Sequence, residues 1–189
     1  YVLTCGMDMH EHARLFSYAP VSETTCAVIG YNGIESSSLL IPEIDPEGRT
    51  VVAIGDRAFM GCERLTVLRF GRLHSLPSFG RSAFAYCTRL RSVVLPEGMT
   101  ELAPSLFEGC AALEHIHLPE TLTAIRTAAF SACKALRVLT LPASLRVIED
   151  CAFAWCGPLT GLRLPESPCV ISGSAFMECY ALEDVLKVG

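Results

Sequence analysis

The segment "AFSACKALRVLTLP", residues 129–142, contains a pattern that returns at a fixed interval along the chain. Its skeleton is Phe130, Cys133, Leu136, Leu139, Leu141 and Pro142. The same skeleton starts at Phe107, 23 residues earlier, and at Phe153, 23 residues later. A fixed interval of this length is typical of stacked structural repeats, so the pattern bears on the whole fold.

Six copies of the skeleton align on their phenylalanines, the first interval being 25 residues and the other four 23. A cysteine follows each phenylalanine after three residues, and a leucine follows each cysteine after three more. The phenylalanines are Phe59, Phe84, Phe107, Phe130, Phe153 and Phe176, the cysteines Cys62, Cys87, Cys110, Cys133, Cys156 and Cys179, and the leucines Leu65, Leu90, Leu113, Leu136, Leu159 and Leu182.

Each unit combines an L-x-x-L-x-L-P segment with an apolar residue five positions before the phenylalanine, such as Ile125 or Ile148. The alternation in the first part predicts a short strand, which the proline ends because it cannot donate to a ladder. One unit cannot bury its own apolar side, whereas stacked units can. We therefore predict an α/β-type leucine-rich repeat solenoid with right-handed coils of about 23 residues. Its parallel sheet should form the concave face, with loops and 3₁₀ turns on the outer arc.

The chain of 189 residues predicts one structural domain, with residues 1–36 as N-terminal cap and residues 37–189 as the array of six coils. Thr24 to Ile29 should form a strand in the cap, and Leu39 to Ile41 the first strand of the stack. Asp45 to Gly48 should form a protruding loop. A last strand is expected around Leu182, Val185 and Lys187, and its open end leaves two alternatives, a covering partner or a longer chain.

Ten cysteines raise the question of disulfides or zinc. Neighbouring cysteines of the repeat column should lie about 4.8 Å apart, farther than the roughly 3.8 Å between Cβ atoms in a disulfide. A straight column also offers no tetrahedral zinc site. We therefore expect buried free thiols and no cofactor. Cys151 and Cys169 should be unpaired, while Cys5 and Cys26 are left as an alternative pair.

Composition and motifs exclude several classes of function. The net charge is −5 and the basic residues are scattered, which does not favour nucleic acid, and no apolar run is long enough for membrane insertion. No catalytic signature is present, so no catalytic residue is assigned. His10 and His12 in "CGMDMHEHAR" permit a weak metal-site alternative, but we assign no metal because no second ligand cluster lies at suitable spacing.

The side chains that alternate with the inward leucines should point outward from the sheet. We call the following set the strand face: Arg69, Val94, His115, His117, Thr140 and Arg163. Its mixture of apolar, imidazole and basic groups suits a protein ligand better than an ion or a nucleic acid. Tyr86, Trp155 and Tyr180 should lie on the outer arc, where they either pack over the coil or anchor a partner as an alternative site.

The pattern I-G-x-x-A-F-x-x-C-x-x-L, present as Ile54, Gly55, Ala58, Phe59, Cys62 and Leu65, resembles the BspA-like leucine-rich repeats of the LRR_5 type. The segment "VIGYNGIESSSLLIPEIDPEGRTVVAIGDRAF" resembles the start of such arrays. The resemblance implies a non-enzymatic protein-binding module with an adhesin-like role on a bacterial cell surface or in secreted form. Its partner would be a host or bacterial surface protein. A structural spacer within a longer chain is the alternative, and a metal- or redox-responsive protein is a third hypothesis.

Overall fold

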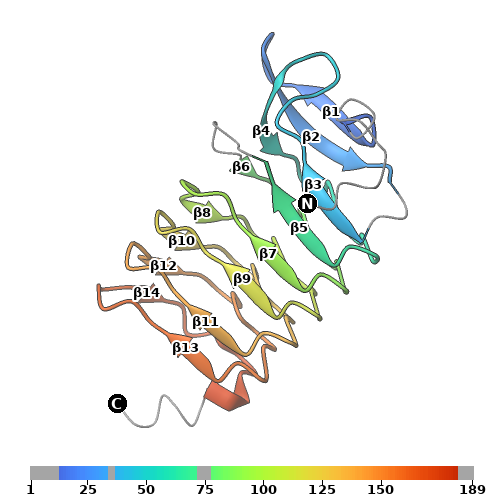
Figure 1. Ribbon diagram of the computed structural model, residues 1–189. Coiled ribbons are helices and arrows are strands. Elements are labelled where there is room, and N and C mark those ends of the chain that lie inside the picture. The colour runs from blue at the N-terminus through green and yellow to red at the C-terminus, as the bar shows by residue number, and fades with distance from the viewer. Residues whose placement is uncertain (1–12, 34–36, 72–77, 183–189) are drawn as a thin grey trace.

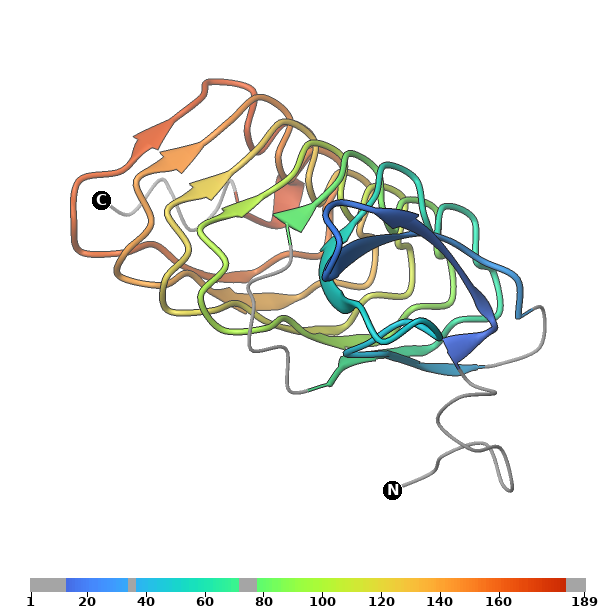
Figure 2. The ribbon, with the colours of Figure 1, turned by 90° about the horizontal axis from the view of Figure 1, so that it is seen from above.

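The computed structural model describes residues 13–33, 37–71 and 78–182, which form a solenoid of stacked coils (Figures 1 and 2). Apart from a helical turn at residues 180–182, the regular elements in this part of the chain are strands, which confirms the predicted leucine-rich repeat architecture. They are β1 (Phe16–Pro20), β2 (Thr25–Tyr31), β3 (Ser38–Ile41), β4 (Thr50–Ile54), β5 (Val67–Phe70), β6 (Ser78–Phe79), β7 (Ser92–Val94), β8 (Glu101–Leu102), β9 (His115–His117), β10 (Ala124–Ile125), β11 (Val138–Thr140), β12 (Val147–Ile148), β13 (Gly161–Arg163) and β14 (Val170–Ile171).

The L-x-x-L-x-L segments form the main sheet, as their alternation predicts. β3, β5, β7 and β9 pair in that order and β11 pairs with β13, all in parallel. Leu68 lies opposite Val93, and both are almost completely buried. The next residue along each of these strands, Arg69 or Val94, is exposed, because successive side chains of a strand point to opposite faces.

A second parallel sheet runs through the apolar positions five residues before the last four phenylalanines, whereas the first two such positions, Ile54 and Phe79, lie in β4 and β6, which pair with each other. β8, β10, β12 and β14 pair in sequence order, with Ile125 opposite Ile148 and Ile148 opposite Ile171. Each strand is only two residues long. The sequence marks these positions as apolar without predicting strands, because two residues are too few to show a period.

The outer arc is held by a third set of hydrogen bonds between coils. Phe107 N donates to Ala129 O and Phe130 N to Ala152 O, each at 2.8 Å. Within a coil, Cys133 N donates to Phe130 O over three residues, as in the predicted 3₁₀ turns. Residues two before and two after the phenylalanine, such as Ala128 and Ala132, have φ near 56° and 59°. Because of these left-handed residues, every second backbone N–H group along this turn, at Ala128, Phe130 and Ala132, donates to a carbonyl of the next coil.

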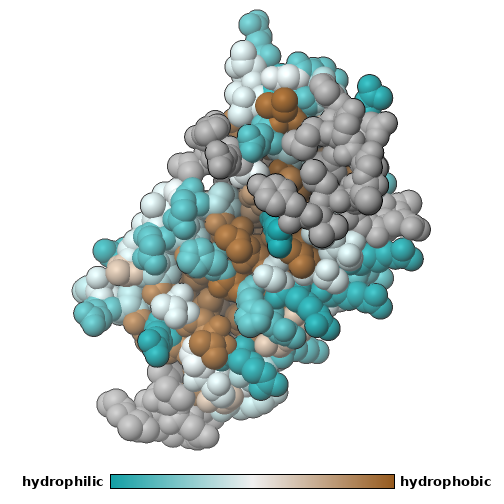
Figure 3. Space-filling view, in the orientation of Figure 1, coloured by the Kyte–Doolittle hydropathy of each residue, from teal (hydrophilic) through white to brown (hydrophobic). Residues whose placement is uncertain are grey.

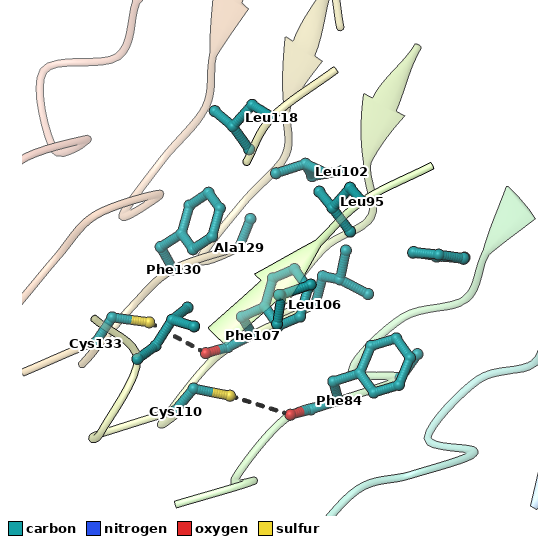
Figure 4. Packing of buried hydrophobic residues seen from close by; sticks show 14 of the residues in the cluster. Phe84, Leu95, Leu102, Leu106, Phe107, Cys110, Leu118, Ala129, Phe130 and Cys133 are labelled. Atoms are coloured by element: carbon teal, nitrogen blue, oxygen red, sulfur yellow. Dashed lines mark hydrogen bonds between the residues drawn. The ribbon is translucent and has the colours of Figure 1, made fainter. Parts of the chain in front are cut away.

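The phenylalanine rings form a continuous column through the centre of the array (Figure 4). Phe130 is fully buried, and its ring stacks between those of Phe107 at 5.7 Å and Phe153 at 5.2 Å between centroids. Ring planes of neighbouring coils differ by only 11° to 15° at these two junctions. The repeat therefore returns in the sequence because each coil presents the same shape to the next.

The N-terminal end carries an antiparallel hairpin, in which β1 pairs with β2 and β2 then pairs with β4 in parallel. The expected protruding loop from Asp45 to Gly48 is corrected at one residue: Asp45 is 1% exposed, whereas Glu47 and Gly48 are exposed. The Asp45 carboxylate accepts hydrogen bonds from the backbone amides of Glu47 and Arg49, which explains its burial. Cys5, His10, His12, Val185 and Lys187 lie outside the described residues.

Candidate functional site

The six residues of the strand face are all exposed and lie on consecutive strands of the main sheet. Val94 is the register partner of His117, and Thr140 is the partner of Arg163. Side chains on neighbouring parallel strands are spaced about 4.8 Å apart. Each half of the sheet, β3 to β9 and β11 to β13, therefore presents its outward side chains as adjacent rows on a rigid backbone.

Two valines give this face an apolar centre. Val94 is 57% exposed, and Val138, which the predicted set omits, is 64% exposed. In Figure 3 the hydrophobic atoms over β7, β9 and β11 lie between hydrophilic margins. His117 Nε2 lies 3.6 Å from the carboxylate of Glu97, which adds a polar contact at the edge of the face. An apolar centre with polar margins is the usual arrangement of a protein interface.

The three aromatic residues lie on the outer arc as predicted, and all are more than 40% exposed. Tyr86 partly packs over its coil, because its ring lies so close to Gly109 that a Cβ atom there would overlap it. Its hydroxyl donates to Glu108 Oε1 at 2.8 Å. Trp155 has a φ of 57°, and its backbone amide donates to Met177 O at 2.9 Å, whereas its indole makes no side-chain hydrogen bond within the described part of the chain. The Tyr180 ring lies over Gly157, where a Cβ atom would overlap it.

Five cysteine thiols bind backbone carbonyls of the preceding coil, which explains why the repeat carries cysteine at this position. Cys110 Sγ donates to Phe84 O at 3.2 Å, and Cys133 Sγ donates to Phe107 O at 3.3 Å (Figure 4). The same contact is made by Cys87, Cys156 and Cys179. We call Cys62, Cys87, Cys110, Cys133, Cys156 and Cys179 the thiol column. Its members are free, as predicted, and so are Cys26, Cys151 and Cys169.

The thiol column has the chemistry of packing side chains rather than of nucleophiles. Burial raises the pKa of Cys110 to about 12, so its thiol is neutral at pH 7. Cys62 differs because it is only half-buried, and its contact with the Cys87 thiol lowers its pKa. No group of three or more His, Cys, Asp or Glu side chains suited to a metal occurs within residues 13–33, 37–71 and 78–182.

Alkylation of the native protein should therefore separate the cysteines into two classes. Cys87, Cys110, Cys133 and Cys156 should stay unlabelled by iodoacetamide at pH 7.5 until urea unfolds the chain, because they are completely buried. Cys62 and Cys151, both partly exposed, should react in the native state. Mass mapping of labelled peptides gives the result directly. Labelling of the four buried thiols at the rate of Cys62, or disulfides between coils, would contradict this account.

A cavity of about 340 Å³ lies where the N-terminal hairpin meets the first coil. Cys62, Glu63 and Arg64 line it from the coil, and Tyr31 lines it from β2. The sequence does not reveal this cavity, because it forms between residues about 30 positions apart. Its lining offers one carboxylate, one guanidinium and one thiol, which is too few groups to define a reaction.

The second sheet carries a charged cluster that the sequence also does not reveal. Arg126 donates to Glu101 at 2.6 Å and to Glu149 at 2.7 Å, which joins three successive coils. Glu149 also accepts bonds from the amide and hydroxyl of Thr127. The bond from Arg126 is the main reason that the pKa of Glu149 is lowered. These charges satisfy one another, so this side is less suited than the strand face to recruit a ligand.

Comparison with known structures shows that the chain is similar to leucine-rich repeat proteins from bacteria. A leucine-rich repeat protein from T. pallidum is 28% identical, covers 93% of this chain and 92% of its own, and superposes with a TM-score of 0.76. One from Bacteroides ovatus is 25% identical with a TM-score of 0.66; the match covers 88% of this chain and 50% of the other. The pneumococcal vaccine antigen PcpA, 17% identical over 85% of this chain and 48% of its own with a TM-score of 0.59, shares the fold.

No curated protein sequence matches the chain. No helix of the described residues is long and apolar enough to cross a membrane. The family model for the BspA type leucine rich repeat region matches residues 48–183 with six copies. This range contains all six phenylalanines of the aligned coils, and the match covers well over half of the chain. The chain therefore belongs to the BspA-type leucine-rich repeat family.

Proposed function

We propose that the array is a non-enzymatic module that binds a protein partner through its strand face. The observation that supports this most strongly is the set of exposed side chains around β9, where His115 and His117 flank Ile116 and Val94 lies opposite His117. Their backbone is fixed by the sheet, so little ordering entropy opposes binding. Arg69 and Arg163 also belong to this face, and arginine is one of the residues that most often contribute strongly to binding at protein interfaces.

The biological setting is proposed from the family resemblance. BspA-like arrays are often displayed on cell surfaces, and we propose a cell-surface or secreted location with an adhesin-like role toward a host or bacterial surface protein. Residues 1–36 would act as the N-terminal cap of one structural domain formed with residues 37–189. Antibody labelling of intact cells should then equal labelling of permeabilised cells, whereas labelling only after permeabilisation would exclude this location.

The outer arc is the second candidate site, because Trp155 is 51% exposed and Tyr180 67% exposed. Large aromatic side chains often dominate binding energy at interfaces. Trp155 also adopts a left-handed backbone conformation that bulky residues rarely take. A structural spacer, with no ligand on either surface, is the third reading.

Two variants, each with several substitutions, should distinguish binding at the strand face from binding at the outer arc and from a spacer without a ligand. A library of linear peptides displayed on phage is selected against the native protein, and the selected peptides are measured by calorimetry. Replacing Arg69, His115, His117 and Arg163 by Ala should weaken binding at least about tenfold, because several interface side chains are truncated together. Replacing Tyr86 and Trp155 by Ala should leave binding unchanged. Circular dichroism must show that both variants are folded.

Loss of affinity only in the Tyr86 and Trp155 variant would move the site to the outer arc and exclude the strand face. Selection that yields no binding peptide would favour the spacer. Unchanged affinity in both variants would contradict both surface assignments.

A further inference from the structure

The main sheet is interrupted between β9 and β11, although these strands occupy equivalent positions in successive coils. β9 pairs with β7 through all three of its residues, and β11 pairs with β13 in the same way. No register pair joins β9 to β11, although every residue of both strands belongs to the described part of the chain. The interruption divides the strand face in the middle.

The same two coils are joined on their other two sides. Ala124 pairs with Val147 and Ile125 with Ile148 in the second sheet. On the outer arc, Phe130 N donates to Ala152 O and Ala132 N to Ala154 O, each at 2.8 Å. The separation of β9 and β11 is therefore a local opening in one side of a continuous array. We call this opening the slot.

Hydrogen bonds that close the other junctions are missing at the slot. At the β7/β9 junction His115 N donates to Arg91 O at 3.0 Å, and at the β11/β13 junction Gly161 N donates to Arg137 O at 2.9 Å. The equivalent bond from Val138 N to Glu114 O is not formed between these described residues.

The other end of the strands shows the same difference. Leu95 N donates to His117 O at 3.3 Å and Leu141 N to Arg163 O at 3.2 Å. Leu118 N makes no such bond to Thr140 O, although both belong to the described chain. The slot therefore has a donor and an acceptor on each edge: Leu118 N–H and Glu114 C=O on the β9 side, and Val138 N–H and Thr140 C=O on the β11 side.

Apolar side chains line the slot. Ile116 is partly exposed, whereas its counterparts Val93 and Leu139 on the neighbouring strands are 1% and 3% exposed. The methyl groups of Val138 lie over Gly161 of β13. Two adjoining hollows of about 230 and 320 Å³ share Ile116, His117 and Val138 in their walls.

The acidic side chains that line the two hollows are not balanced by lysine or arginine. Glu114 lines the first hollow and Glu120 the second, and both are exposed. The other ionisable side chains in the walls are His115 and His117, and neither hollow is lined by lysine or arginine. Electrostatic complementarity therefore favours a cationic partner segment.

We propose that the slot binds an extended, lysine-bearing segment of a protein partner, which adds main-chain hydrogen bonds to the edges of β9 and β11. The backbone donors and acceptors supply affinity for a strand-like main chain, as in β-augmentation. Ile116 binds the apolar side chains that alternate residues of the segment point toward the core, and Val138, Glu114 and Glu120 bind the lysines that the residues between them point outward. This inference rests on the proposed binding function and assigns the partner's chemistry and its place.

Amide hydrogen exchange tests the slot in the free protein. Val138 and Leu118 amides should exchange at least about tenfold faster than the matched amides of Gly161 and Leu141, because only the latter are hydrogen-bonded. Equal, slow exchange at the four positions would overturn the slot. That result would leave the binding role of the strand face intact.

A defined peptide then tests the occupant. The probe is acetyl-Thr-Val-Lys-Val-Lys-Val-Thr-amide, compared with the same peptide carrying Glu for Lys and with one N-methylated at its valines. The lysine peptide should slow exchange at Val138 and Leu118, and both altered peptides should bind at least about tenfold more weakly. The variant Glu114→Lys/Glu120→Lys should lose affinity for the lysine peptide, while Glu178→Lys, a charge reversal at an exposed outer-arc position away from the slot, should keep it.

Each other result overturns the proposal in a recognisable way. Binding without slower exchange at the slot would place the peptide elsewhere on the strand face. Equal binding of the N-methylated peptide would exclude main-chain bonding. Absence of binding by the lysine peptide would exclude this occupant, whereas the library selection above decides the binding function independently.

Discussion

Replacing Phe130 by Ala should lower the free energy of unfolding by about 3–5 kcal/mol, as for other fully buried phenylalanines. The Phe130 side chain is fully buried and stacks between two rings of the column. Coils on both sides hold its surroundings in place, so the cavity should not collapse. Because coils of a solenoid contact only their neighbours, the loss should also weaken coupling between the two halves. Urea unfolding followed by circular dichroism measures both effects.

Phe176→Ala is the matched control for this variant. Phe176 is only partly buried and stacks on one ring, that of Phe153 at 5.3 Å. Its loss should cost about 1–2 kcal/mol, in proportion to the smaller apolar area buried. An unfolding midpoint of Phe130→Ala that equals the parent's, or a larger effect of Phe176→Ala, would contradict the central position of the ring column.

Replacing Asp45 by Ala should cost about 2–3 kcal/mol, because hydrogen bonds to a charged group are lost together from a buried site. The Asp45 carboxylate accepts bonds from Glu47 N at 3.0 Å, Arg49 N at 2.8 Å and Arg49 Nε at 2.6 Å. Without it, two backbone amides of the turn lose their partner. Glu47→Ala is the control: Glu47 also contacts Arg49, but its side chain is 64% exposed, so the loss should stay below about 1 kcal/mol.

The contribution of Asp45 should depend on pH in a defined direction. Burial alone would raise the pKa of Asp45, but hydrogen bonds from the Arg49 amide and guanidinium outweigh burial and hold it below its usual value. A lowered pKa in the folded state stabilises the protein above the unfolded value of about 3.9, and this stabilisation is lost as pH falls. The difference between parent and Asp45→Ala should therefore be constant from pH 5 to 7 and shrink below about pH 4. A difference that grows on acidification would contradict this assignment.

The columns of the core could be predicted from the sequence because they depend on periodicity alone. Phe130 and Cys133 return at fixed spacing, and residues in one register position must share one environment. The alternation in the strands likewise places His115 and His117 outward, and both are exposed. These features follow from the period of a strand and the period of the repeat.

Other features depend on interactions between coils that no period shows. The thiol of Cys133 bonds to the carbonyl of Phe107, and this partner is visible only once the coils are stacked. The burial of Asp45 depends on a turn closed by Arg49. The slot between β9 and β11 is the clearest case, because the repeat pattern predicts an unbroken sheet at that junction.

The most direct test of the strand face is a map of backbone chemical shifts as a peptide selected on the native protein is added. If the strand face is the binding site, the chemical-shift changes should be concentrated at Val94, His115, His117 and Thr140, on the exposed side of β7, β9 and β11. Changes confined to the outer arc around Tyr86, Trp155 and Tyr180, with the main sheet unaffected, would contradict it.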